Sequence, residues 1–293
     1  MRGLVLAGGN GSRLWPLTKG VNKHLLPIYD KPLIHYPIST LMAAGIREIA
    51  LIVNPHDQES YFRLLGTGEQ FGVRFTYIVQ NEPAGIAQGI LLAKEFLSTH
   101  NFALILGDNI FHGPGLGRHL MSYQDLHGAK VFAYRVSDPE NYGVVDFDSN
   151  NQIISIEEKP QNPKSNFVIP GLYFYDSNAM HFAAELKPSA RGELEITDLN
   201  RKYLERNLLD VSILPRGTAW LDTGTVSSLH DASTFVRILE ERQGNKVSCL
   251  EEIAWNQGWI NETDLHVLAE SYGQTPYGEY LRLLTASPLE RGK

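Results

Sequence analysis

The sequence has little or none of several features that mark other classes of protein. Its single cysteine, Cys249, cannot form an internal disulfide, which is typical of a reducing compartment. No apolar run approaches the ~20 residues that a membrane-spanning helix requires, and the first residues lack the shape of a signal peptide. There is no block of Lys and Arg, and the net charge is -7, which argues against a nucleic acid as partner. We therefore expect a cytoplasmic protein that binds neither membranes nor nucleic acids.

Three common nucleotide and metal motifs are also missing. The P-loop pattern G-x-x-x-x-G-K-[ST] does not occur. The dinucleotide pattern G-x-G-x-x-G is incomplete, because Leu14 stands where the third glycine belongs after Gly9 and Gly11. The ten histidines show no spacing typical of a zinc site. A dinucleotide-dependent oxidoreductase is thus the weaker alternative, and zinc is not indicated.

The composition is that of a globular protein, and apolar runs recur regularly along the chain. Hydrophobic residues make up 43% and charged residues 20% of the 293 residues, which is enough for a full core. Short β-rich runs alternate with helical patterns in the first half, which predicts an α/β fold with a mostly parallel, Rossmann-like sheet flanked by helices. The expected strands are 4–7, 48–53, 73–79, 102–106 and 130–135, and the expected helices are 33–44, 57–65, 85–97 and 116–126.

The second half has a different pattern. Residues 141–175 contain short strands and turns, which we interpret as a small β insertion that forms a lid or wall over the site. The last fifty residues show helical patterns, so we expect a small helical C-terminal part. The strands expected in the insertion are 143–147, 153–158 and 167–175, and the helices expected near the end are 247–256, 262–271 and 278–284.

A glycine-rich turn follows the first predicted strand at once. Gly8, Gly9 and Gly11 have no Cβ to keep an anion away from the backbone N–H groups. Arg13 and Lys23 follow and can add two positive charges at the same place. An arginine fork suits two phosphate oxygens, whereas a lysine is a point charge. This combination is typical of a polyphosphate site, whereas an ordinary strand-to-helix turn explains the glycines but not the cations.

Two aspartates follow apolar strands in a similar way. Asp108 comes just after a predicted strand, and Asp222 follows the apolar run 219–221. In a parallel sheet the carboxyl ends of strands meet in one crevice, so Asp108 and Gly8 can share it. Two carboxylates with phosphate oxygens and waters form the kind of site that Mg²⁺ prefers. Each aspartate could instead cap a helix, since a helix is also predicted to begin near Thr225.

Six ordered blocks of sequence resemble one enzyme family. The segments 6–14 and 23–27 are together similar to the signature of the sugar-phosphate nucleotidyltransferases. Further blocks narrow the resemblance to the members of that family that transfer a thymidylyl group. Six blocks in order, from Arg2 to near the C-terminal end, are far more specific than one glycine-rich turn. The further blocks are 106–109, Glu157-Glu158-Lys159-Pro160, 191–198, 219–224 and 240–244.

The resemblance implies a reaction and its requirements. A thymidylyl group would pass from dTTP to glucose 1-phosphate with release of pyrophosphate, with Mg²⁺ as cofactor and without a covalent enzyme intermediate. The family also implies a homotetramer and an early step of deoxysugar and surface polysaccharide biosynthesis. The expected domain covers 1–244, with a nucleotide half at about 1–140 and a sugar-binding part at about 141–224, and a helical extension covers 245–293. A uridylyltransferase acting on a sugar 1-phosphate and a non-catalytic nucleotide-sugar sensor stay open as alternatives.

The resemblance also assigns roles to individual positions. The residues expected to act in catalysis are Arg13, Lys23, Asp108 and Lys159. The residues expected to bind Mg²⁺ are Asp108 and Asp222. The residues expected to contact the nucleotide are Gly8, Gly9, Gly11, Ser12, Arg13, Lys23, His24, Gln80 and Gly85. The residues expected to contact the sugar and its phosphate are Asn109, Gly143, Glu158, Lys159, Ile169 and Tyr173.

Three of these assignments depend on local geometry and chemistry. Glu158 is expected to accept hydrogen bonds from sugar hydroxyls and Lys159 to hold the sugar phosphate. Adjacent strand residues normally point to opposite faces, although the strand end before Pro160 can relax that rule. Gln80 can both donate and accept hydrogen bonds, which matches the edge of thymine or uracil without distinguishing the two bases.

Two positions depart from the family pattern. His24 stands where the family has Gln, immediately after Lys23, and Pro170 stands where Thr is expected. A neutral imidazole offers one donor and one acceptor, and histidine titrates near neutrality. We therefore expect the KM for the nucleotide to depend on pH in the neutral range. The alternative is that His24 packs against the loop and contacts no ligand. Pro170 removes a hydroxyl and a backbone donor near the sugar site.

Overall fold

The computed structural model describes residues 1–150 and 152–286. Residue 151, in the predicted sugar-binding part, and residues 287–293, at the end of the predicted extension, lie outside the described residues. Among the described helices, none is both long and apolar enough to cross a membrane.

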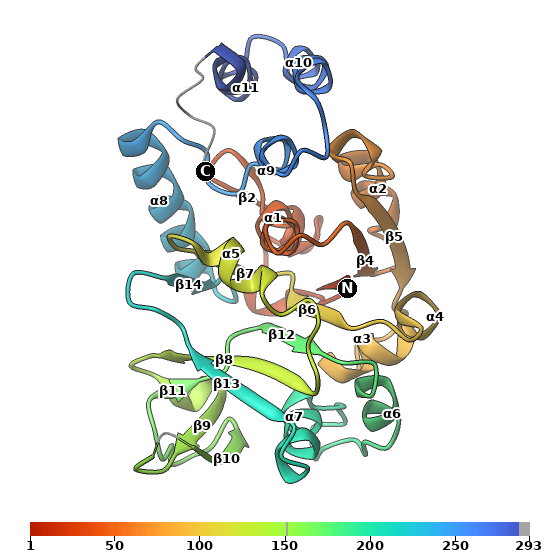
Figure 1. The fold of residues 1–293 in the computed structure, drawn as a ribbon, viewed down its shortest axis with the longest axis vertical. Helices are drawn as coiled ribbons and strands as arrows, with labels where there is room; N and C mark the ends of the chain where they lie inside the picture. Colours follow the sequence, from red (N-terminus) through yellow and green to blue (C-terminus); the bar gives the residue numbers. More distant parts are fainter. Residues whose placement is uncertain (151, 287–293) are drawn as a thin grey trace.

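Four parallel strands form the half of the sheet that carries the glycine-rich turn. The central strand β1 (Arg2–Ala7) pairs with β4 (Glu48–Val53) on one side and β6 (Phe102–Leu106) on the other, and β5 (Arg74–Val79) pairs with β4. Parallel strands need crossover connections, which here contain α1 (His35–Ala43), α2 (Gln58–Leu65), α3 (Ile86–Leu92) and α4 (Lys94–Leu97). The predicted parallel, Rossmann-like sheet is confirmed (Figure 1).

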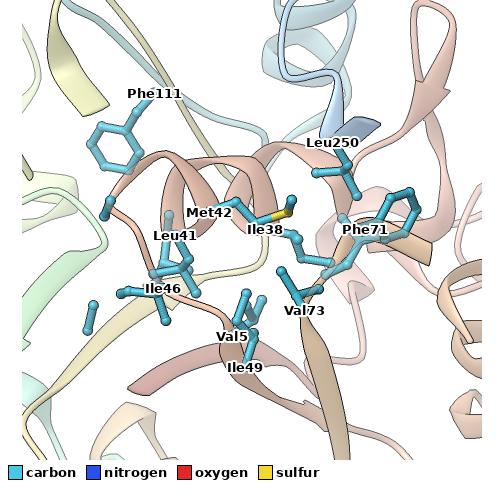
Figure 2. Packing of buried hydrophobic residues seen from close by; sticks show 14 of the residues in the cluster. Val5, Ile38, Leu41, Met42, Ile46, Ile49, Phe71, Val73, Phe111 and Leu250 are labelled. Atoms are coloured by element: carbon cyan, nitrogen blue, oxygen red, sulfur yellow. The ribbon is translucent and has the colours of Figure 1, made fainter. Parts of the chain in front are cut away.

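Both faces of these strands are buried, as expected for a covered parallel sheet. Val5 packs toward Ile38 and Leu41 of α1, and Figure 2 shows this face of the core. The neighbouring residue Leu4 faces the other side, in a second cluster that contains Ile90 of α3. The uninterrupted apolar runs in the sequence therefore arise because successive side chains enter two different cores.

Beyond β6 the sheet continues with a reversed strand. β12 (Leu172–Tyr175) runs antiparallel between β6 and β8 (Ala129–Arg135), and β13 (Leu209–Ile213) pairs parallel with β8. The predicted β insertion is present as β9 (Gly143–Phe147), β10 (Ile153–Glu158) and β11 (Phe167–Val168), and it extends the same sheet past β8. The strand expected over 167–175 is interrupted, because Pro170 has no N–H for the ladder.

A second, two-stranded sheet lies next to the end of β6. β7 (Asn109–His112) begins directly after Asp108 and pairs antiparallel with β14 (Ala219–Asp222). The next helix, α8 (Val226–Gln243), has Thr225 as its N-cap, whose side chain accepts a hydrogen bond from the Ser228 N–H. The predicted helix start is therefore confirmed, and Thr225 rather than Asp222 caps it.

The C-terminal helices share the core of the parallel half. α9 (Leu250–Asn256), α10 (Glu262–Ser271) and α11 (Pro276–Ala286) confirm the predicted helical part. Leu250 and Leu281 belong to the same buried cluster as Ile38 of α1, and Figure 2 shows Leu250 beside this helix. Figure 1 shows these helices at the end of the molecule opposite β9 and β10.

Two of the helices in the structure differ in length from those predicted. The pattern over 85–97 gives α3 and α4, but hydrogen bonds from the Ala93 N–H to Gly89 and from the Leu97 N–H to Ala93 cross the break. The helix expected over 116–126 is shorter, because the Tyr123 N–H bonds back only three residues, to Leu120, and closes the helix. The other elements of the described residues are β2 (Pro27–Ile28), β3 (Lys31–Pro32), α5 (Leu116–Met121), α6 (Ala179–Ala184) and α7 (Ile196–Glu205), besides four short 3₁₀ turns in the same part of the chain.

Candidate active site

A cavity of about 210 Å³ opens beside the end of β6, between the glycine-rich turn and the antiparallel part of the sheet. It brings together predicted residues from both halves of the sequence, although their roles in binding stay predictions. The predicted residues that line it are Arg13, Asp108, Asn109, Gly143, Glu158, Lys159, Ile169, Tyr173 and Asp222.

The backbone of Lys159 explains how two adjacent side chains reach this cavity. β10 ends at Glu158, and Lys159 has a φ of 44°, in the left-handed region. This conformation is unfavourable for a residue with a side chain by about 1–2 kcal/mol. The Lys159 N–H donates to the Tyr142 carbonyl at 2.9 Å, which fixes the turn. The strand alternation is broken at this point, so that Glu158 and Lys159 both line the cavity.

The side of the cavity around Glu158 is built from polar groups with defined partners. The Thr197 hydroxyl donates to the Glu158 carboxylate, and Arg191 lies 3.5 Å from its other oxygen. A Cβ on Gly143 would lie 3.2 Å from the Thr197 hydroxyl oxygen, so glycine allows this close packing. Burial and the charges of Glu158 and Asp108 raise the pKa of Tyr173, so its hydroxyl stays protonated and can donate to a ligand.

Two carboxylates meet on the other side of the cavity. Asp222 lies opposite Asn109 in the β14–β7 ladder and therefore beside Asp108. Burial and the charge of Asp108 raise the pKa of Asp222 to about 6. Burial alone would also raise the pKa of Asp108, but the adjacent Lys23 ammonium holds it well below its ordinary value. The Asn109 amide donates to the Asp108 carboxylate at 3.0 Å and fixes its orientation.

The predicted cations approach this pair from the glycine-rich turn. Lys23 forms an ion pair with Asp108, and its Cε lies 4.0 Å from where a Cβ on Gly9 would be. Arg13 lies against Gly224, where an added Cβ would be 3.1 Å from the guanidinium and 3.2 Å from an Asp222 oxygen. Lys23 thus lies beside Asp108, and Arg13 lies beside Asp222.

The other residues of the turn stand just outside the cavity lining. Gly11 has a φ of 59° and precedes a short 3₁₀ helix, Ser12–Leu14. Ser12 is exposed at the start of that helix. A Cβ on Gly8 would collide with the Gln80 side-chain oxygen. Gly8 is buried at this contact, whereas Gly9 and Gly11 are partly exposed and lie beside the Lys23 side chain.

The donor set fits magnesium better than a transition metal. Within residues 1–150 and 152–286, no group of three or more His, Cys, Asp or Glu side chains is arranged to hold a metal. Two neighbouring carboxylates that disfavour each other's charge suit a hard divalent cation whose remaining ligands are phosphate oxygens and waters. Asp108 and Asp222 would hold such an ion.

The family match covers most of the chain and all of the residues that line the cavity. Residues 2–238 match the family described as nucleotidyl transferase. The chain belongs to the nucleotidyl transferase family. Within this family, relatives named glucose-1-phosphate thymidylyltransferase match at nearly full length. The Neisseria gonorrhoeae relative is 54% identical over 96% of this chain and 98% of its own, and the Mycobacterium tuberculosis relative is 52% identical with the same coverage.

Solved structures of nucleotidyl transferase relatives have the same fold. A Bacillus anthracis protein assigned as a glucose-1-phosphate thymidylyltransferase, solved in complex with sucrose, is 42% identical, with a TM-score of 0.75 over 81% of this chain and 95% of its own. A UDP-glucose pyrophosphorylase in complex with UDP-glucose is 26% identical, with a TM-score of 0.71 over 81% of this chain and 98% of its own.

His24 differs from the expectation set by its place in the nucleotidyl transferase signature. Its side chain is 2% exposed and does not line the cavity. One ring nitrogen lies 2.8 Å from the Asn22 amide oxygen and 3.3 Å from the Tyr61 hydroxyl. Burial and the Lys23 charge lower the pKa of His24 to about 3. The expected titration near neutrality is therefore wrong, and the geometry favours the alternative in which His24 packs beneath the loop.

Gln80 and Gly85, two further residues expected to contact the nucleotide, make contacts within the protein. The Gln80 side chain is buried and donates to Gln88 at 2.7 Å. Gly85 has a φ of 101°, and a Cβ there would lie 2.5 Å from the Leu194 carbonyl oxygen. The Leu194 N–H donates to Ala84 at 2.8 Å. The loop expected to contact the base is thus joined directly to the segment that leads to Thr197.

Several cavity residues were not singled out from the sequence. Trp220 and Thr197 lie inside blocks that carry the nucleotidyl transferase resemblance, so a signal for them was present. Trp220 donates to the Asn109 amide oxygen at 2.6 Å and thereby supports Asp108 indirectly. Tyr142 and Ile86 had no such signal, because only the fold brings them to the cavity. The full set of additional lining residues is Ile86, Leu106, Asn141, Tyr142, Gly171, Ile196, Thr197 and Trp220.

Proposed function

We propose that this protein transfers a thymidylyl group from dTTP to α-D-glucose 1-phosphate and releases pyrophosphate. The observation that carries the proposal is that one cavity is lined by two sets of charged side chains, each of which includes a cation suited to a phosphate. Glu158, the last residue of β10, and Lys159, which follows it, line the cavity on one side, and Arg13 lines it with Asp108 and Asp222 on the other. One set suits a sugar phosphate and the other a nucleoside triphosphate with its cation. The names of the relatives supply the identity of the two substrates.

The sugar 1-phosphate binds at the β10 side. Glu158 accepts hydrogen bonds from sugar hydroxyls, and the protonated Tyr173 hydroxyl donates one. Lys159 binds the phosphate and holds its attacking oxygen toward the nucleotide. Because Lys159 is locked by its backbone turn, this positioning requires little rearrangement on binding.

The triphosphate binds along the glycine-rich turn. Backbone N–H groups around Gly9 and Gly11, together with Ser12, surround the phosphates, and Arg13 binds the departing pyrophosphate. Lys23 neutralises charge that develops at the α-phosphorus. A new bond forms between the sugar-phosphate oxygen and the α-phosphorus as the bond to pyrophosphate breaks, in line and without a covalent enzyme intermediate. A magnesium ion held by Asp108 and Asp222 would add charge neutralisation on the phosphates.

The test is a matrix of nucleoside triphosphates against sugar 1-phosphates with pyrophosphate release as readout. We expect dTTP with glucose 1-phosphate to give the highest kcat/KM. A higher value with UTP would instead identify a uridylyltransferase. Binding of both substrates without pyrophosphate release, at any magnesium concentration, would identify a non-catalytic sensor.

The assembly, location and pathway are also proposals. The family resemblance favours a homotetramer in the cytoplasm that supplies deoxysugar and surface polysaccharide synthesis. Analytical ultracentrifugation of the purified protein measures the assembly directly, and a stable monomer at working concentration would contradict the first of these inferences.

A further inference from the structure

Gln88, in the first turn of α3, binds two groups of the loop that precedes it. Its side-chain oxygen accepts from the Gln80 amide at 2.7 Å and from the Ala84 backbone N–H at 2.8 Å. Gln88 does not line the cavity, and no motif in the sequence marked it. Its contacts nevertheless determine which atoms Gln80 can offer to a ligand.

The orientation of both amides follows from one backbone group. A backbone N–H can only donate, so the Gln88 atom that faces Ala84 must be the oxygen. The Gln80 atom that faces this oxygen must then be the amide nitrogen. The Gln80 oxygen consequently points the other way, toward Gly8, where any Cβ would collide with it. The buried Gln80 side chain is thus fixed with its acceptor on the side of the glycine-rich turn.

We propose that Gln88 is a positioning residue for base selection. By holding the Gln80 nitrogen it leaves the Gln80 oxygen as the group presented to the base, and an acceptor matches the N3–H of thymine or uracil. Cytosine has an acceptor at N3, so the fixed oxygen repels it. The inference rests on the proposed function, in which Gln80 contacts the base.

The loop does not depend on Gln88 alone for its shape. On the sugar side the Leu194 N–H donates to the Ala84 carbonyl at 2.8 Å, and the Ala87 N–H donates to the Leu194 carbonyl at 3.1 Å. Removing the Gln88 amide therefore leaves the loop anchored but frees Gln80 to rotate by half a turn. The rotated amide presents an N–H donor, which can donate to the N3 acceptor of cytosine but no longer matches the N3–H of thymine.

The experiment compares Gln88→Met with Gln88→Glu. Methionine has a similar shape but no acceptor, whereas the glutamate carboxylate accepts from the same two donors. The quantity measured is the ratio of kcat/KM for dTTP to that for dCTP, with glucose 1-phosphate saturating. We expect the ratio to fall about three- to tenfold in Gln88→Met, the effect of losing one oriented hydrogen bond. We expect Gln88→Glu to keep the parent ratio, because its charge affects both triphosphates equally.

The matched control is Gln70→Met. Gln70 also forms a side-chain hydrogen bond with the backbone, here as a donor to the Leu65 carbonyl at 2.8 Å, but this partner is the last residue of α2 rather than part of the loop that holds Gln80. The dTTP to dCTP ratio should stay at the parent value in this variant. Thermal melts of all variants confirm that they fold, and Gln88→Ala replaces Gln88→Met if the latter does not.

The outcomes separate the inference from the proposed function. The inference is overturned if the dTTP to dCTP ratio is unchanged in folded Gln88→Met, or in Gln88→Ala where that replaces it. It is also overturned if Gln88→Glu lowers the ratio as much as Gln88→Met does. A parent protein that releases no pyrophosphate from dTTP and glucose 1-phosphate refutes the proposed function instead. Calorimetric binding of dTTP and dCTP to parent and variants, without the sugar, still tests base selection in that case.

Discussion

Asp222 faces Asn109 across the β14–β7 ladder, and this single pairing places two carboxylates from distant parts of the chain side by side. Burial and the charge of Asp108 raise the pKa of Asp222 to about 6, which shows that the pair is electrostatically unfavourable in the protein alone. This arrangement supports the proposal that the pair holds a cation, which would relieve the repulsion between the two carboxylates.

Asp222→Asn should separate function from stability. The amide keeps the shape but removes one of two neighbouring buried charges, so the metal-free variant should melt at or above the parent temperature at pH 8. Turnover of dTTP and glucose 1-phosphate should fall by orders of magnitude at any magnesium concentration, because one cation ligand is lost. Parallel thermal melts and pyrophosphate assays check this. Full activity of the variant, or undiminished parent activity in excess EDTA, would contradict the metal assignment.

Substitutions of Lys159 should separate backbone strain from the side-chain charge. Both Lys159→Ala and Lys159→Gly remove the ammonium, so both should raise the KM for glucose 1-phosphate more than that for dTTP. Glycine adopts a positive φ freely, whereas alanine does not. The free energy of unfolding, measured by urea denaturation, should therefore be about 1 kcal/mol higher for Lys159→Gly than for Lys159→Ala. Equal stability of the two would show that the φ of 44° is not maintained in solution.

His24 should affect the pH dependence of stability rather than of binding. Its folded pKa of about 3 lies below the ordinary value of 6.5, so between these values only the unfolded chain takes up the proton. Burial of the neutral His24 ring therefore contributes fully to the free energy of unfolding above about pH 6.5. This contribution falls by about 1.4 kcal/mol per pH unit as the pH drops from 6.5 toward 3.

The comparison with His24→Gln isolates this effect. Urea denaturation from pH 4.5 to 7.5 should show the parent losing stability relative to the variant on acidification. The KM for dTTP should follow the same pH profile in both proteins. A profile that differs between them in the neutral range would restore the role in nucleotide binding that the sequence suggested.

Gly85→Ala should be far more harmful than the same change at another glycine with a positive φ. At Gly85 the added Cβ would meet the Leu194 backbone, whereas at Gly192, with a φ of 77°, nothing lies within 4 Å. Gly192→Ala should lower the free energy of unfolding by about 1 kcal/mol through strain alone. Gly85→Ala should lower the free energy of unfolding by about 1–3 kcal/mol more, because of the clash. It should also raise the KM for both substrates, because the loop expected to contact the base meets there the segment that leads to Thr197. Equal losses in denaturation experiments would contradict this packing.

The parallel half of the fold could be predicted because each strand is an apolar run that enters two cores. The rule that ligands lie beyond the carboxyl ends of strands also placed Asp108 at the cavity, although Gly8, which was expected to share it, lies outside the lining. β7 was missed because four residues carry too little pattern. The helix α7 was missed although Ile196, Leu199 and Tyr203 recur at helical spacing on its buried face.

The burial of His24 could not be predicted, because it depends on a contact between distant segments. A Cβ on Gly107 would lie 2.8 Å from the His24 ring, so the ring fills the space beneath the end of β6. The sequence contains both residues but nothing that joins them. The same holds for the contact of Gly85 with Leu194, which only the folded chain brings together.

The link between Thr223 and Asp108 has a consequence for the newly made chain. Thr223 donates both its N–H and its hydroxyl to the Asp108 carbonyl, across 115 residues of sequence. A ribosome-bound chain that has emerged only through β13 already contains the glycine-rich turn and the whole parallel half, but neither β14 nor Asp222. During synthesis the strands of the sheet therefore emerge before β14 and before the helices α9, α10 and α11 that complete their core, and we expect truncated products that end before β14 to release no pyrophosphate.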